Sequence, residues 1–310
     1  MGSRALWSRV AARLGTSVIV AWASVTAAFL ALHALPGRIE DILAGDIDTP
    51  GLREAIAAEW GLDQSLLAQY WAFLSRIAGG DLGTSYVLRQ PVREIVGSQL
   101  WPTVQLALTA GVLAVALAVA VALLTAGRGR LSRKVASAIE LVLASTPVFW
   151  IGILLLMLFS FTLRWFPVSG ANGWQSLVLP AIALALPTAG LLAQVLREAI
   201  EKALDQPFVT TIRARGVGEL TIRTRHLLRH ASLPAVTLGG WLIGGLLGGA
   251  VITEKVFGRP GLGSVTLGAV LTHDVPVVLA VVLLAAFIHV AASTLLDILY
   301  LLIDPRLRAA

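Results

Sequence analysis

Six long apolar runs, separated by polar loops, dominate the pattern along this chain. A helix rises about 1.5 Å per residue and must cross roughly 30 Å of hydrocarbon, so a run of about 18 or more apolar residues predicts a membrane span. We therefore predict an all-α, polytopic membrane protein whose six transmembrane helices cover residues 14–35, 103–126, 139–163, 177–196, 235–252 and 276–303.

Composition supports a membrane protein. Hydrophobic residues make up 57% of the chain, charged residues only 14%, and the mean hydropathy is +0.82, which lies outside the range of soluble domains. The first run follows Arg4, Arg9 and Arg13, as in a signal peptide, but it is too long for one and five further runs come after it. The absence of cysteine excludes disulfides and thiolate chemistry.

Lysine and arginine predict the orientation of the bundle. Of the 24 such residues, 16 fall in the amino terminus, the loops 127–138 and 197–234, and the tail, whereas 8 fall on the other side. By the positive-inside rule, both termini and the loop 197–234 face the cytoplasm.

Three parts follow along the chain. Residues 1–35 hold the amino terminus and first span, residues 36–100 form an external lobe, and residues 101–310 form a core with five spans and the loop 197–234. Within the lobe, apolar residues at near-helical spacing predict two short helices. The lobe can be a docking surface for a partner or a cap that only covers the bundle, and both interpretations stay open.

Motifs for catalysis and for nucleotide binding are missing. A phosphate-binding loop of the GxxxxGK[ST] type requires Ser or Thr after its lysine, and Lys134, Lys202 and Lys255 are all followed by other residues. The sequence also lacks HExxH, GxSxG and any His/Asp/Glu cluster at metal-ligand spacing. We expect no catalytic residues, no metal site and no cofactor bound by this chain.

Polar residues inside the spans are few. His289, Ser293 and Asp297 lie at i, i+4 and i+8 in the sixth run, so they share one helix face. This stripe either lines a translocation path or forms hydrogen-bonded contacts between helices. Pro147, and likewise the prolines of the fourth run, predict bent helices.

The basic loop 197–234 carries a recognisable motif. Pro207 can start a short helix, "PFVTTIRAR", which Gly216 and Gly218 end, and a second basic helix runs to Pro234. The loop resembles the EAA-type motif of permease subunits of binding-protein-dependent ABC importers. The matching residues are Phe208, Val209, Arg213, Ala214, Arg215, Gly216, Arg225, His226, Leu228, Leu233 and Pro234.

The resemblance extends over almost the whole chain, in the order expected of the first permease of the dipeptide, oligopeptide and nickel group. The matching segments include "LALHALPG", "GGDLGTSY", "STPVFWIGILLLMLFSFTLRWFPVSG", "VFGRPGLGSVTLGAVLTHDVPVV" and "LLDILYLLIDPRLR". Three residues depart from the family pattern: Phe208 stands for the usual Tyr, Ile212 for the usual Ala, and His289 for an apolar or aromatic residue.

The resemblance implies a type I ABC importer permease fold in a bacterial inner (plasma) membrane. The implied partners are a second homologous permease, two ATPase subunits or domains that bind ATP and Mg, and an external solute-binding protein. The implied coupling helix would use exposed Val209, Ile212 and Val217 to dock on an ATPase. Its residues are Phe208, Val209, Ile212, Arg213, Ala214, Arg215, Gly216 and Val217, supported by Arg225, His226, Leu233 and Pro234.

The implied cargo is a di- or oligopeptide, and the alternative within the group is nickel or another small solute. From a different class, a secondary transporter driven by an ion gradient would need charged midplane sites and often an internal repeat. The chain shows no repeat, and only Asp297 offers an acid near a span.

Overall fold

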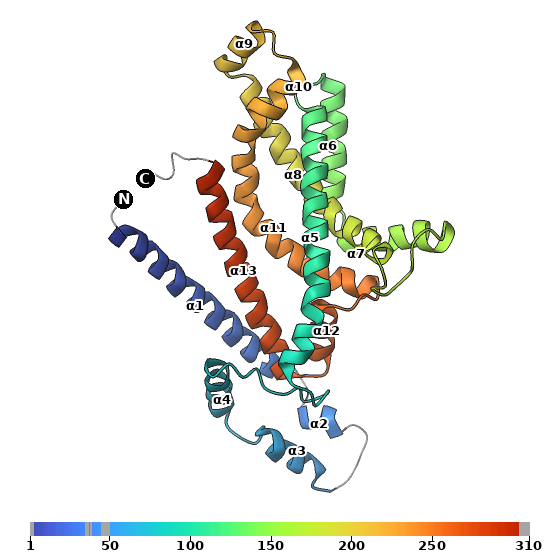
Figure 1. The fold of residues 1–310 in the computed structure, drawn as a ribbon. Helices are drawn as coiled ribbons and strands as arrows, with labels where there is room; N and C mark the ends of the chain where they lie inside the picture. Colours follow the sequence, from blue (N-terminus) through green and yellow to red (C-terminus); the bar gives the residue numbers. More distant parts are fainter. Residues whose placement is uncertain (1–2, 35–36, 38, 45–49, 304–310) are drawn as a thin grey trace. The chain divides into compact units, whose positions relative to one another are not determined.

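The computed structural model describes residues 3–34, 37, 39–44 and 50–303, with the side chains of all of these except 3–14, 230, 233, 239–241 and 297–303. Every regular element within these residues is a helix (Figure 1), which confirms the all-α fold class. In chain order the elements are α1 (Ser3–Ala34), α2 (Ile39–Ala44), α3 (Leu52–Trp60), α4 (Leu66–Ala78), α5 (Val92–Thr125), α6 (Arg130–Ser145), α7 (Val148–Leu155), the π-helix η1 (Leu156–Thr162), α8 (Gln175–Leu204), α9 (Pro207–Ala214), α10 (Glu219–Thr221), the π-helix η2 (Ile222–Leu227), α11 (Leu228–Val256), α12 (Leu262–Leu271) and α13 (Val275–Ile303).

Several helices are long and apolar enough to span a membrane. Four such segments occur in the described part of the chain, and a fifth results if α6 and the α7–η1 segment count as one broken span. The run predicted at 235–252 lies inside α11. The chain is thus a multi-pass membrane protein, and the count of six spans stays a prediction. The four segments are Gly15–Ala34, Val92–Thr125, Gln175–Leu204 and Val275–Leu296.

The run at 139–163 is interrupted by a break of 99° between α6 and α7, which is sharper than the bend predicted from its proline. Thr146 adopts an extended conformation, with φ −82° and ψ 126°, directly before Pro147. A proline disfavours the helical conformation of the residue that precedes it, so the helix ends here and a new one begins after the ring. By contrast, Pro180 and Pro187 both lie inside the continuous 30-residue helix α8.

The first of two compact units comprises Met1–Trp101 and Gly261–Val290. Its apolar core combines residues of α1, α4, α12 and α13 with the start of α5. Asp274, which is 2% exposed, fixes the segment before α5, because its carboxylate accepts hydrogen bonds from the Ser85 hydroxyl and from the backbone N–H of Tyr86, the latter at 3.1 Å.

The second unit comprises Pro102–Pro260 and Ala291–Ala310. Helix α8 is central to it, since it contacts α6, α7 and α11. A stripe of fully buried alanines, one every four residues along α5 and at the residue directly after it, allows close helix packing. The stripe consists of Ala110, Ala114, Ala118, Ala122 and Ala126. The three-part division expected along the chain stays a prediction, because these units are defined by contacts and each joins separate stretches of sequence.

Candidate functional site

The basic loop between α8 and α11 folds into the short helices α9, α10 and η2. Pro207 stands at the first position of α9, where its missing N–H is not needed and its fixed φ suits a helix. Gly216 follows the end of α9 with φ +78°, a conformation that residues with a Cβ rarely adopt. The loop therefore contains the short helix that the sequence predicts.

The apolar residues of α9 face their own chain. Val209 is completely buried, and Ile212 and Val217 are half-buried against a cluster that includes Ile200 of α8 and Ile222 of η2. The expectation that Val209 is exposed for docking is wrong, and for Ile212 and Val217 it holds only in part. The reason is that so short a helix is held in place by burying its apolar face. Phe208, which is 40% exposed, is the large apolar residue that α9 presents outward.

Arg213 braces the loop from within. Its Nε donates to Oε1 of Glu219 at 2.6 Å, and its Nη2 donates to Oε2 at 3.3 Å. These hydrogen bonds lower the pKa of Glu219 from its ordinary value of 4.5 and raise the pKa of Arg213. The pair closes the turn that contains Gly216, so Arg213 already has an acidic partner inside this chain.

Arg223 ties the loop to the end of α5. It is 8% exposed, its Nη1 donates to the carbonyl oxygen of Leu123 at 3.2 Å, and its Nη2 lies 3.9 Å from Glu219. Gly127 makes room for this contact, because a Cβ there would lie 2.7 Å from a methyl of Leu204 and 3.4 Å from Arg223 Nη2. Helix α5 and the loop are thus joined by backbone and side-chain contacts.

A buried ion pair joins α6 to α8, the helix that leads into the loop. Arg197 binds Glu140 through Nε at 3.0 Å and through Nη2 at 2.7 Å, and its Nη2 also donates to the Ser137 hydroxyl at 2.9 Å. The Arg197 and Glu140 side chains are 5% and 2% exposed. Glu201 extends the network, since its Oε1 lies 3.6 Å from Arg197 Nη1 and 3.3 Å from Arg133 Nε. A paired, fully hydrogen-bonded arrangement is what a buried charge requires.

A charged groove of about 510 Å³ opens between the end of α8, the start of α6 and the loop. Its charged side chains are equally divided in sign, and Arg213 and Glu219 form part of the wall. The four basic residues are Arg133, Lys202, Arg213 and Arg223, and the four acidic residues are Glu198, Glu201, Asp205 and Glu219.

The remaining predicted residues of the loop differ in exposure. Ala214 and Arg215 are exposed beside Gly216, whereas His226 is half-buried and Arg225 exposed in η2. Pro234 lies inside α11 and is exposed. The side chain of Leu233 lies outside the described residues. The structure therefore brings the predicted coupling residues into one loop, with their outward side formed by Phe208, Thr210, Thr211, Ala214 and Arg215.

The polar stripe predicted on the last span is only partly described. On α13 the side chain of His289 is exposed and that of Ser293 is half-buried, and the side chain of Asp297 lies outside the described residues. Both roles proposed for the stripe stay predictions.

Sequence reasoning missed four charged residues that organise the site, namely Glu140, Arg197, Glu219 and Arg223. The sequence contained a signal for the first two, an acid at the start of one apolar run and an arginine directly after another. Charged side chains at such positions are costly in a membrane unless they form an ion pair. Nothing in the order of residues says which acid pairs with which base.

With this geometry in view, the chain can be placed among known proteins. Residues 114–309 match the family described as "Binding-protein-dependent transport system inner membrane component". The match covers more than half of the chain, so the protein belongs to this family and is a permease subunit of a binding-protein-dependent ABC importer.

Its individual relatives cover nearly the full length. The chain is similar to the glutathione transport system permease protein GsiC of Salmonella choleraesuis (strain SC-B67), of Salmonella typhi and of Escherichia coli (strain K12). In each case 36% of 281 aligned residues are identical, over 90% of this chain and 92% of the relative. These relatives confirm the resemblance to the dipeptide and oligopeptide group, and they are named as permeases rather than as enzymes.

Proposed function

We propose that the loop 197–234 couples this permease to a separate ATPase that binds ATP and Mg, and that α9 is the element on which the ATPase acts. The supporting observation is that the apolar face of α9 is buried at Val209 while Phe208 and Arg215 face outward. Because one face of α9 is packed on its own bundle and the other face is exposed, a force that a partner applies to α9 can be transmitted to the bundle. Closure of two ATPases would then move α9 and switch the bundle between inward-facing and outward-facing states.

The contacts behind α9 support a rigid transmission. Arg213–Glu219 holds α9 to α10, Arg223 holds the loop to α5, and Arg197–Glu140 holds α8 to α6. The Arg197–Glu140 pair is buried and has several hydrogen bonds, so it resists relative movement of α6 and α8. The Arg213–Glu219 pair is exposed and the Arg223 link is a single hydrogen bond to a backbone carbonyl, but together they connect α9 to α10 and the loop to α5. A displacement of α9 would therefore reach α5, α6 and α8. The charged groove beside α9 offers acidic and basic groups for a partner's side chains.

The proposed assembly contains this chain, a second homologous permease, two ATPase subunits or domains, and an external solute-binding protein. We place both termini and the loop 197–234 in the cytoplasm, on the strength of the lysine and arginine distribution. The proposed cargo is a di- or oligopeptide. The relatives named for transport of glutathione, itself a short peptide, support this class.

Substitution of Phe208 tests the coupling surface. In the assembled importer reconstituted in liposomes, we expect Phe208→Ala to lower ATP-driven peptide uptake at least tenfold, because exposed aromatic anchors dominate the energy of protein interfaces (on the order of 2 kcal/mol or more). The matched control is Leu220→Ala on α10, whose side chain is 64% exposed and which we expect to keep uptake near wild type. Uptake and ATPase copurification unchanged in Phe208→Ala would exclude α9 as the contact.

A further inference from the structure

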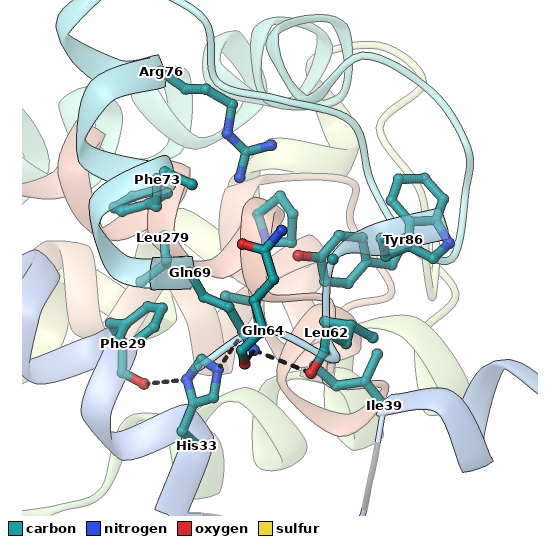
Figure 2. Close-up of a pocket in the computed structure, with 15 residues that line it drawn as sticks. Phe29, His33, Ile39, Leu62, Gln64, Gln69, Phe73, Arg76, Tyr86 and Leu279 are labelled. Atoms are coloured by element: carbon teal, nitrogen blue, oxygen red, sulfur yellow. Dashed lines mark hydrogen bonds between the residues drawn. The ribbon is translucent and has the colours of Figure 1, made fainter. Parts of the chain in front are cut away.

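A pocket of about 280 Å³ lies within the first compact unit, between the carboxyl-terminal end of α1, the start of α4 and the start of α13. We name it the lobe pocket (Figure 2). Aromatic and aliphatic side chains form most of its wall, among them Phe29, Leu62, Phe73, Tyr86 and Leu279. Its size is close to the lower end of small-molecule sites, about 300 Å³, so it suits a ligand of one amino acid residue rather than a long chain.

Part of the polar wall is held in place by hydrogen bonds. The Gln69 amide nitrogen donates to the carbonyl oxygens of Leu62 at 3.2 Å and of Gln64 at 3.0 Å. His33 Nδ1 donates to the Phe29 carbonyl at 2.8 Å, and His33 Nε2 lies 3.4 Å from Gln69 Oε1. The wall is therefore shaped before any ligand arrives.

Three polar groups that point into the pocket have no hydrogen bond within the described part of the chain. They are the Arg76 guanidinium, the side-chain amide of Gln64 and the Tyr86 hydroxyl, and Figure 2 shows them around one space. The Tyr86 ring is held in place in two ways. The backbone N–H of Tyr86 donates to the Asp274 carboxylate, and the centroid of its ring lies 4.9 Å from that of the Trp60 ring. Burial of Tyr86 raises its pKa, so its hydroxyl stays a proton donor at neutral pH.

Charge selects the class of ligand. Among the described residues, the lining of the pocket includes the cationic side chain of Arg76 and no acidic side chain, and no carboxylate in this part of the chain lies within ion-pair distance of Arg76. A planar guanidinium binds a carboxylate through paired hydrogen bonds. Arg76 and Gln64 are exposed at the rim, so a ligand can enter from solvent with its apolar part directed toward Phe29 and Leu279.

We propose that the lobe pocket binds a small carboxylate that carries one aromatic or branched aliphatic side chain, with Arg76 pairing with the carboxylate. Tyr86 and Gln64 would supply the neighbouring hydrogen bonds. A free amino acid and the C-terminal residue of a short peptide share this chemistry. The site is separate from the loop 197–234, and the proposal does not depend on how that loop works.

The test is calorimetric titration of the purified full-length chain in lipid nanodiscs. The probes are N-acetyl-L-phenylalanine and N-acetyl-L-phenylalaninamide, which differ only in the carboxylate. We expect saturable binding of the acid and at least tenfold weaker binding of the amide, because hydrogen bonds to charged groups are the stronger ones (roughly tenfold or more in affinity).

Variants then test whether Arg76 is the residue that binds the carboxylate of the ligand. Arg76→Gln should weaken binding of the acid at least tenfold and leave the weak binding of the amide unchanged, which shows that the pocket is intact. Arg93→Gln removes the same charge from an exposed residue that does not line the pocket, and it should change nothing. Equal binding of acid and amide, an equal loss in both variants, or no saturable binding would overturn the proposal.

A second pair of probes separates the two sources of the ligand. Glycyl-L-phenylalanine binding more tightly than L-phenylalanine supports a peptide C-terminus, and the reverse order supports a free amino acid. Either order supports the carboxylate site. Failure of both to compete with N-acetyl-L-phenylalanine contradicts it.

Discussion

Gly216 is the residue that allows the chain to turn after α9. Its φ of +78° is strained for any residue with a Cβ, although no atom lies within 4 Å of the position that a Cβ would occupy. We expect Gly216→Ala to destabilise the turn by about 1–2 kcal/mol for conformational reasons alone. Gly218→Ala is the matched control, because Gly218 has φ −66°. Protease cleavage within residues 213–219 of the purified protein should accelerate only in Gly216→Ala, and equal rates in the two variants would show that the turn is not strained.

Glu219 gives the same turn a dependence on pH. The pKa of Glu219 is lowered in the folded protein from its ordinary value of 4.5. Its contribution to the stability of the turn is therefore fully present above pH 4.5 and is lost as the pH falls through the lower folded value. Hydrogen exchange of residues 214–218, corrected for the intrinsic rate, should therefore lose protection below pH 4.5. Glu219→Gln should show low protection at every pH. Wild-type protection that persists unchanged to about pH 3, below the ordinary carboxylate range, would contradict this role.

At the scale of helices, apolar runs predicted most of the elements, because a span must be continuous, long and apolar whatever it packs against. The break at Pro147 was predicted only as a bend, since a proline in a membrane helix can do either and the outcome depends on the neighbouring helices. The burial of Val209 was not predicted. An isolated α9 would expose it, and it is covered only once the fold brings it into a cluster that includes Ile200 and Ile222.

Close packing of α6 on α8 depends on Gly190. A Cβ at this position would lie 2.8 Å from the Glu140 carbonyl oxygen and 3.0 Å from the Ala144 amide nitrogen, and backbone atoms cannot move aside cheaply. We expect Gly190→Ala to lower stability by about 1–3 kcal/mol, as overpacking does. Gly248→Ala in α11, where no atom lies within 4 Å, is the control and should be neutral or slightly stabilising. Equal thermal stability of the two purified variants would show that the helices can separate without cost.

At the scale of the whole molecule, the family assignment defines a permease that works within a larger transport system. The chain supplies helices that are suited to spanning a membrane, a loop braced by ion pairs, and a separate pocket in the first compact unit. The sequence predicted the loop because its motif is local. It could not predict the pocket, because Phe29, Arg76, Tyr86 and Leu279 are brought together only by the fold.

The central proposal is that α9 faces the cytoplasm and contacts the ATPase. Because the chain has no cysteine, a single Thr211→Cys, at an exposed position of α9, can be labelled with a membrane-impermeant maleimide. Asp63→Cys, in the segment 36–100 that we propose to lie on the external side, is the control. We predict that Thr211→Cys reacts in inverted vesicles but not in right-side-out spheroplasts, that Asp63→Cys does the opposite, and that assembly with the ATPase slows labelling of Thr211→Cys alone. Labelling of Thr211→Cys from outside, or labelling unaffected by the ATPase, would contradict the claim.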